Sequence, residues 1–228
     1  DGSAEATTDA GRQLAHLHVC LRDFAHDYEP FQGSFHDSAT VRQHLQMIRT
    51  DKRTGSLQRA AAVTESLVIR YDRSSNRVDR VGYASWKRQV IHGDWHPGNL
   101  LFSDRKVVGV VDFDSIRIAP PVTDLANGML QFSILGVSPD PAQWPDAFDQ
   151  ERLLQFLAGY REVVPLSKRK LYGLVDLMIE AMVAEAVLPV AATGFFGDHS
   201  GLDFLRMIVR KTKWLRHHRK ELTETMLA

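Results

Sequence analysis

Apolar residues recur every three or four positions over much of the first 88 residues, which is the spacing of amphipathic helices. The first helix is predicted to begin near Asp9, a residue type that favours the N-terminal cap. Further helices are predicted over residues 41–48 and 56–69, whereas residues 28–39 and 70–82 are polar or rich in turn formers and predict connections. The apolar face of the first helix consists of Leu14, Leu17, Leu21, Phe24 and Tyr28.

The pattern changes after residue 88, where short apolar runs replace the helical period. Strands are predicted over residues 88–91, 99–102 and 107–113, with a turn at 103–106. Pro120 and Pro121 end this β-ribbon, since proline cannot donate to a strand ladder. Helices are then predicted over residues 122–135, 150–163, 167–187 and 201–221. We therefore expect an α+β protein that is mostly α-helical, with a small embedded β-ribbon.

The composition is that of an ordinary globular protein. Its 228 residues are 44% hydrophobic, enough to build a buried core, and its 28 basic and 28 acidic side chains cancel, so the total charge indicates no nucleic-acid or membrane partner. The distribution is uneven, because residues 121–205 hold 11 acids against 5 bases and residues 206–228 hold 7 bases against 2 acids. We interpret the basic end as the solvated face of a terminal helix, where cations are favoured.

The single cysteine, Cys20, excludes an intramolecular disulfide and indicates a reducing compartment. The first nine residues lack the basic and apolar regions of a signal peptide. The longest apolar run, residues 177–190, contains Glu180 and Glu185 and is too short to span a bilayer. We therefore expect a cytoplasmic location and no membrane partner.

The stretch that carries chemistry runs from Val90 through His92-Gly-Asp94-Trp-His96-Pro-Gly-Asn99 to Phe102, and a second acidic element, Asp112-Phe-Asp114, follows it. An Asp two residues after a His, an Asn five residues later and an Asp in the next apolar strand have the spacing of a phosphoryl-transfer loop and its metal-binding strand. Phosphoryl transfer requires a carboxylate that orients the attacking hydroxyl and oxygen ligands that hold magnesium on the phosphates.

Asp94 is the candidate for the first task, and Asn99 with Asp112 for the second. His92 is expected to brace the loop through hydrogen bonds. For His96, a bracing role and a contact near the phosphates are equally compatible with its position. Gly93 permits a tight backbone, and the Pro-Gly pair turns the chain so that Asp94 and Asn99 face one site.

These motifs resemble the catalytic core of the aminoglycoside phosphotransferase and choline kinase-like family of small-molecule kinases. The segment Leu14-Ala-His-Leu-His18 resembles the helix that opens the C-terminal lobe in that family. The resemblance implies a protein-kinase-like fold, Asp94 as catalytic base, Asn99 and Asp112 as Mg²⁺ ligands, ATP as phosphate donor, and Asp124 as a structural residue. Asp114 stands where relatives vary between Gly and Asp and is a weaker site candidate.

The first lobe of such kinases carries a glycine-rich phosphate loop and a strand lysine, and neither is recognisable before Asp94. No GxGxxG occurs there, and neither Lys52 nor Lys87 sits in an alternating strand. We therefore expect residues 1–9 to be a polar leader or former inter-lobe linker and residues 10–228 to be a C-terminal lobe that is inactive without its N-terminal lobe. Within it, we assign residues 90–102 as the catalytic loop, 107–114 as the metal-binding strand and 121–228 as the helical substrate region.

Two alternatives stay open at this level. A lobe without the nucleotide clamp is compatible with a non-catalytic, substrate-binding or pseudokinase-like module. A metal-dependent hydrolase is compatible with His92, Asp94 and His96, whose alternating side chains converge on a metal if they lie on one strand.

The acceptor is expected against the helices that follow Asp112. The acidic balance of that region favours a small cationic substrate such as an aminoglycoside, an amino alcohol or an amino acid. Residues of suitable type to line its pocket are Trp144, Phe148, Tyr160, Tyr172, Glu180, Glu185, Phe195 and Phe196.

Overall fold

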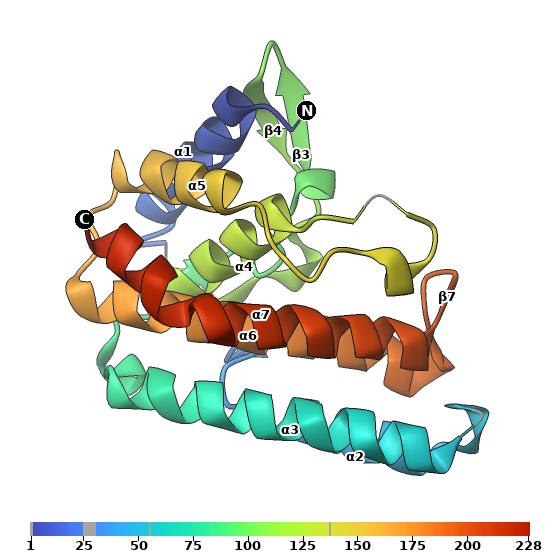
Figure 1. The fold of residues 1–228 in the computed structure, drawn as a ribbon. Helices are drawn as coiled ribbons and strands as arrows, with labels where there is room; N and C mark the ends of the chain where they lie inside the picture. Colours follow the sequence, from blue (N-terminus) through green and yellow to red (C-terminus); the bar gives the residue numbers. More distant parts are fainter. Residues whose placement is uncertain (1, 25–30, 55, 137) are drawn as a thin grey trace.

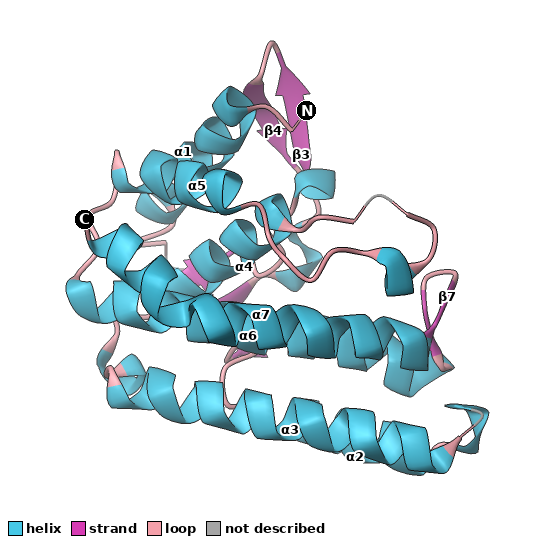
Figure 2. Cartoon of the chain, viewed as in Figure 1, coloured by secondary structure: helices cyan, strands magenta, loops and turns pink. Residues whose placement is uncertain are grey.

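The computed structural model describes residues 2–24, 31–54, 56–136 and 138–228. Helices dominate, and three small sheets are set among them (Figure 2). The helices are α1 (Ala4–Cys20), α2 (Ala39–Thr50), α3 (Leu57–Arg80), α4 (Val122–Ser133), α5 (Gln150–Arg161), α6 (Lys168–Thr193) and α7 (Gly201–Leu227). The strands are β1 (Phe31–Gln32), β2 (Gln89–Ile91), β3 (Leu100–Ser103), β4 (Lys106–Val110), β5 (Arg117–Ala119), β6 (Phe195–Phe196) and β7 (His199–Ser200).

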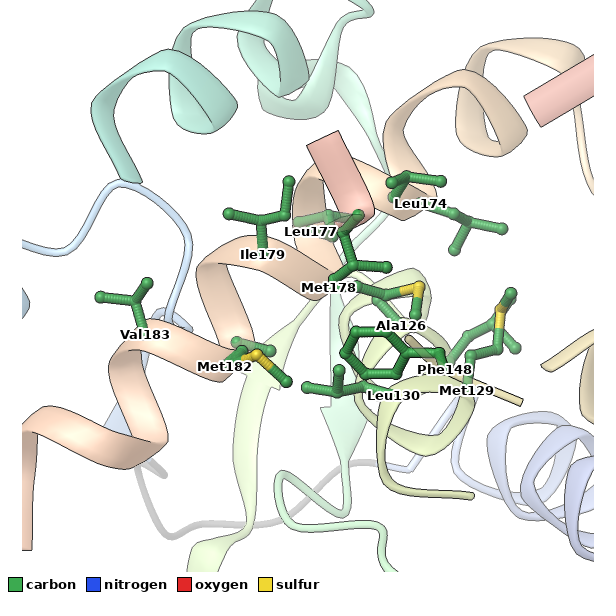
Figure 3. Packing of buried hydrophobic residues seen from close by; sticks show 14 of the residues in the cluster. Ala126, Met129, Leu130, Phe148, Leu174, Leu177, Met178, Ile179, Met182 and Val183 are labelled. Carbon is green, nitrogen blue, oxygen red and sulfur yellow. The ribbon is translucent and has the colours of Figure 1, made fainter. Parts of the chain in front are cut away.

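The helices lie in layers around α6, which contacts α2, α3, α4 and α7 (Figure 1). α2 and α3 form one outer layer, and α1 with α5 and the β3–β4 hairpin lie on the opposite side. Figure 3 shows how α6 fills the centre, where Leu177, Met178 and Met182 pack with Leu130 of α4 and with Phe148. α6 is buried on nearly every side, which explains why its sequence lacks a polar face.

The sheets are short and mixed. β5 pairs in parallel with β1 and antiparallel with β2, so it is the central strand of a three-stranded sheet. This sheet lies beside the loop that follows β2. β3 and β4 form the predicted hairpin. The expected third strand, residues 107–113, ends at Val110, because Asp112 adopts a left-handed conformation with φ of 61° that no strand continues through.

The predicted start of the first helix at Asp9 is wrong, because α1 begins at Ala4 and is capped by Ser3, whose side chain accepts a hydrogen bond from the Ala6 amide. Residues 4–9, expected to precede the helix, form its first turns. Glycines in both helices let α1 approach α5 closely: a Cβ on Gly11 would collide with the carbonyl group of Phe156, and a Cβ on Gly159 would collide with the carbonyl group of Thr8. Both glycines are therefore required for this helix pair.

The predicted connection over residues 70–82 is also wrong, since α3 continues to Arg80. Its second half buries Tyr71, Ser74, Ser75 and Val78, which recur at helical spacing and face inward although two of them are polar. Short polar side chains inside a helix do not disturb the apolar stripe when larger residues supply the packing. Tyr28, expected on the first helix, lies outside the described residues.

Within the described parts of the chain, no helix combines the length and the apolar character that a bilayer crossing requires.

Candidate active site

The loop that follows β2 is held by a buried carboxylate of α4. Asp124 accepts hydrogen bonds from the backbone amides of His92 and Gly93, both at 2.9 Å, and its Oδ2 lies 3.2 Å from Nε2 of His18. His18 in turn meets the Tyr160 hydroxyl at 2.9 Å. Four elements distant in sequence therefore fix the entrance of the loop, and Asp124 is a positioning residue.

Gly93 is the pivot of this loop. Its φ is 84°, and a Cβ at this position would collide with the carbonyl oxygen of Ser115. A side chain there would be strained and would also push the loop away from the residues that follow β4.

His92 contacts backbone groups through both of its ring nitrogens. The ring is fully buried, its Nε2 lies 3.0 Å from the carbonyl oxygen of Val111, and its Nδ1 accepts from the Asp94 amide at 3.3 Å. Both ring nitrogens thus face backbone groups, and neither is available to a metal ion. No group of three potential His, Cys, Asp or Glu ligands occurs among the described residues. The geometry gives no support to the hydrolase alternative.

Asp94 is half-buried and projects beside His96 and Asn99. Its Oδ2 lies 3.5 Å from His96 Nε2, and Asn99 Nδ2 donates to the Asp94 backbone carbonyl at 2.9 Å and to Oδ2 at 3.2 Å. The hydrogen bond from His96 lowers the pKa of Asp94 and outweighs the effect of burial, with a further contribution from Asn99. Asp94 is therefore ionised and oriented at neutral pH.

His96 braces its own loop and also interacts with Asp94, and its contact near the phosphates stays a prediction. Its Nδ1 accepts from the Gly98 amide at 3.0 Å and so caps the turn Pro97–Asn99. Its Nε2 side interacts with Asp94, which raises the pKa of His96 against the effect of burial, and the charges of Glu185 and Asp112 act in the same direction. The raised pKa of His96 favours its charged form beside Asp94.

Asn99 and Asp112 are brought together by the hairpin. The Val111 amide donates to the Asn99 carbonyl at 3.0 Å, which places Asp112 one residue beyond the pairing. Asn99 is tied to Asp94 through Nδ2, so the side-chain amide oxygen of Asn99 remains as a ligand atom. The exposed Asp112 carboxylate makes no hydrogen bond or ion pair with another described residue. One amide oxygen and one carboxylate fit a magnesium ion that keeps several waters and binds phosphates. Asp114 lies exposed in the next turn.

A cavity of about 190 Å³ is lined by residues of α4, α6, α7 and the segments beside them. Of the eight residues predicted to line an acceptor pocket, Trp144, Glu185 and Phe196 line this cavity. Glu180 instead lies buried against His36, and Tyr160 against His18. Phe148 is core, and Tyr172 and Phe195 are exposed. These five side chains, which were candidates to line an acceptor pocket, do not line this cavity.

Sequence reasoning missed Gln131 and Lys211, which also line the cavity, and Asn127, which bonds Glu185. Gln131 and Asn127 stand four positions apart on one face of α4, and this spacing is the signal that the sequence offers.

Comparison with known proteins places this geometry in context. The model of a family described as phosphotransferase enzyme family matches residues 1–174. No curated protein matches the chain.

Solved structures with similar folds include kinases and an aminoglycoside phosphotransferase. A microcompartment-associated aminopropanol kinase has a TM-score of 0.69 at 15% identity, and the matched region covers 97% of this chain and 64% of the kinase chain. The coverages below are given in the same order. An aminoglycoside phosphotransferase from Alicyclobacillus acidocaldarius has a TM-score of 0.69 at 17% identity, with 99% and 67% covered. An amicoumacin kinase, solved in complex with AMP-PNP, Ca²⁺ and Ami, has a TM-score of 0.61 at 15% identity, with 99% and 60% covered. The chain thus spans about 60 to 67% of the length of these proteins.

Proposed function

The chain belongs to the phosphotransferase enzyme family, and from this premise we propose that it is the catalytic lobe of an ATP-dependent kinase that phosphorylates a hydroxyl group of a small molecule. Its fold is α+β and mostly helical, as predicted, with the C-terminal-lobe architecture of protein-kinase-like phosphotransferases. At these identities the structural likeness concerns the fold, so substrate and chemistry are argued from the site.

The observation that carries the proposal is the joint fixation of Asp94 and Asn99. Asn99 Nδ2 bonds the Asp94 carbonyl and carboxylate together, so the side chain that orients the hydroxyl and the side chain that faces the metal hold a constant relation. Phosphoryl transfer depends chiefly on such positioning and on charge stabilisation.

The residues divide the work as follows. Asp94 accepts a hydrogen bond from the acceptor hydroxyl, orients its oxygen and takes its proton as the new P–O bond forms and the bond to the leaving diphosphate breaks. Asn99 and Asp112 are the candidate ligands of Mg²⁺, which when bound neutralises the phosphate charge. The raised pKa of His96 favours a positive charge beside Asp94.

The proposal includes the domain organisation. We propose that the lobe predicted over residues 10–228, which in the structure includes α1 from Ala4 on, works with a nucleotide-binding lobe that carries the glycine-rich loop and the strand lysine. The acceptor classes that fit the acidic helical region are amino alcohols, amino sugars and amino acids, all of which bear a cation.

The test is a coupled ATPase assay on a protein that also carries the nucleotide-binding lobe, with a panel of these alcohols. Asp94→Asn is expected to lower kcat by about 10² to 10⁴-fold, because a positioned general base contributes that much. Its melting temperature should match that of the parent. Turnover near the parental rate would contradict the assignment of Asp94. Separately, calorimetric titration of Mg-ATP into the 228-residue chain measures the affinity of this chain alone for the nucleotide.

A further inference from the structure

A cavity of about 220 Å³ lies where the C-terminal end of α3 meets α6 and α7 (Figure 1). It shares no lining residue with the cavity between α4, α6 and α7 or with the candidate active site. Three of its wall residues are arginines and one is an aspartate, so the wall carries more positive than negative charge. The lining residues are Arg77, Arg80, Val81, Tyr172, Asp176 and Arg219.

The aspartate in this wall, Asp176, is an incomplete partner for the arginines beside it. Its side chain is 1% exposed, Arg77 Nη1 donates to its Oδ1 at 3.3 Å, and Arg219 Nη1 lies 3.8 Å from its Oδ2. The second distance is too long for a hydrogen bond, and Oδ2 has no hydrogen-bond partner among the described residues. The ion pair between Arg12 and Asp9 is much closer, at 2.7 Å. Because a guanidinium group has five N–H donors, most donors of Arg77 and Arg219 stay open to a ligand.

Arg80 has no polar partner within the described part of the chain. Its side chain is exposed and forms neither a hydrogen bond nor an ion pair with another described residue. The helix dipole favours cations in the last turn of α3, which accounts for Arg77 and Arg80 taken singly. It does not account for Arg219, which lies about two turns before the end of α7 and lines the same cavity. The convergence of arginines from two helices therefore has another reason.

The carboxylates of α3 that could neutralise these arginines lie on the other flank of the helix. Asp72 accepts a hydrogen bond from Arg42 Nε at 2.8 Å, and Asp79 Oδ1 lies 3.2 Å from His36 Nε2. Arg42 belongs to α2, and His36 lies just before it. The acidic side chains of this part of α3 thus face the α2 side, whereas its arginines face α6 and α7.

The positive charge continues along the seam between α3 and α7. Arg70 Nη1 donates to the Ser66 carbonyl oxygen at 2.8 Å, and the buried Nε of Arg70 has no hydrogen-bond partner among the described residues. Burial lowers the pKa of Arg70, and the charges of Arg216 and Arg73 act in the same direction. Three more guanidinium groups therefore gather about one to two turns before the cavity, and their field draws anions toward it.

The charges of the wall specify the kind of anion. Guanidinium groups recognise carboxylates and phosphoryl groups through paired hydrogen bonds. A carboxylate has two oxygens and one charge, whereas the phosphoryl group of a monoester has three free oxygens and a charge of about −1.5 to −2 at pH 7. Three guanidinium groups against one carboxylate therefore match a phosphoryl group better. Tyr172, which is 46% exposed at this cavity, adds an aromatic face for an organic group.

We propose that this cavity binds a phosphoryl group, carried by a small phosphate monoester or present as free phosphate, with Arg77, Arg80 and Arg219 as its ligands. Asp176 is then a positioning residue, which holds Arg77 at one of its oxygens and has Arg219 near the other. The site is separate from the candidate active site, so the proposal does not depend on the kinase function.

Calorimetric titration of the 228-residue chain, without nucleotide or metal ion, tests the proposal. The probes are phenyl phosphate, inorganic phosphate and phenyl sulfate, which has the shape of phenyl phosphate but a single negative charge. At pH 8 and low ionic strength, phenyl phosphate is expected to bind at least about tenfold more tightly than phenyl sulfate. Tighter binding of phenyl phosphate than of inorganic phosphate supports a monoester as the ligand, and equal or tighter binding of inorganic phosphate supports free phosphate. No saturable binding of either phosphate, or equal affinity for phenyl sulfate, overturns the proposal.

Arg80→Gln locates the binding. It removes a charge that pairs with no described residue, so the melting temperature should stay at the parental value while the affinity for phenyl phosphate falls at least about tenfold. Arg59→Gln is the matched control, because it removes an exposed arginine of the same helix about 30 Å away and should bind as the parent does. Parental affinity in Arg80→Gln contradicts the proposal. An equal loss in both variants also contradicts it, because that result indicates attraction by net charge alone.

Arg219→Gln tests the contribution of α7 and should also weaken the binding of phenyl phosphate by at least about tenfold. If this variant melts as the parent does and keeps the parental affinity, the assignment of α7 to the site is wrong.

Discussion

Replacing Asp124 by Asn should loosen the catalytic loop and destabilise the whole chain. The Asp124 carboxylate is buried and accepts two backbone hydrogen bonds, from His92 and Gly93, at opposite oxygens. Asparagine keeps one of these oxygens and replaces the other by an NH₂ group. That group then faces a backbone N–H, so one bond is lost and two donors oppose each other.

The cost follows from these contacts. A hydrogen bond to a charged group contributes about 1.5–3 kcal/mol, and a buried donor left unpaired costs about 1–3 kcal/mol. A loss of about 3 kcal/mol of unfolding free energy is therefore expected, and for a chain of this size it lowers the melting temperature by about 6–12 °C.

The assay is urea and thermal unfolding followed by circular dichroism. Asp198→Asn is the matched control, because Asp198 is exposed in the turn between β6 and β7 and its change should cost less than about 0.5 kcal/mol. If Asp124→Asn unfolds with the same midpoint as this control, then Asp124 does not hold the loop and the reasoning is refuted.

Three further outcomes are expected. Asp112→Asn, which tolerates the left-handed backbone of this position, should weaken magnesium-dependent nucleotide binding by about tenfold or more in a two-lobed protein, and unchanged affinity would count against a ligand role. Burial disfavours the charged form of His36, but Glu180 and Asp79 outweigh burial and raise the pKa of His36. The parent should therefore have a larger free energy of unfolding than His36→Gln. This difference should be complete below a pH of about 6.5 and should disappear as the pH rises through the raised pKa. Stability curves from pH 5.5 to 9 measure this, and a pH-independent difference would contradict it. Gly159→Ala should cost about 3 kcal/mol in urea unfolding, and a neutral effect would mean that α1 and α5 separate easily.

Much of the fold follows from local pattern, because apolar spacing alone marks the cores of all seven described helices. Their ends do not follow. Ser74 and Ser75 lie inside α3 because residues far along the chain cover them, and a polar run gives no sign of that. β5 is only three residues long and exists through pairing with β1 and β2, so its formation depends on tertiary contacts.

The site divides in the same way. Asp94, His96 and Asn99 lie within six positions, so their spacing in the sequence reports their spacing in space. Glu185 lies on α6, 91 positions after Asp94, and the sequence alone does not distinguish it from Glu180 on the same helix. Only the structure separates the carboxylate paired with His36 from the carboxylate that faces a cavity.

The close contact between α1 and α5 also has a consequence for synthesis on the ribosome. Arg12 and Glu162, which join these helices at their crossing, are 150 positions apart. At about 5–20 residues per second, α1 leaves the ribosome roughly 8–30 s before its partner is complete. During that interval its small-residue face, shaped to fit one other backbone, has no surface to pack on. α1 therefore reaches its native contacts with α5 only long after its own synthesis, and its protection in the nascent chain depends on chaperones or on slow collapse of the segments between.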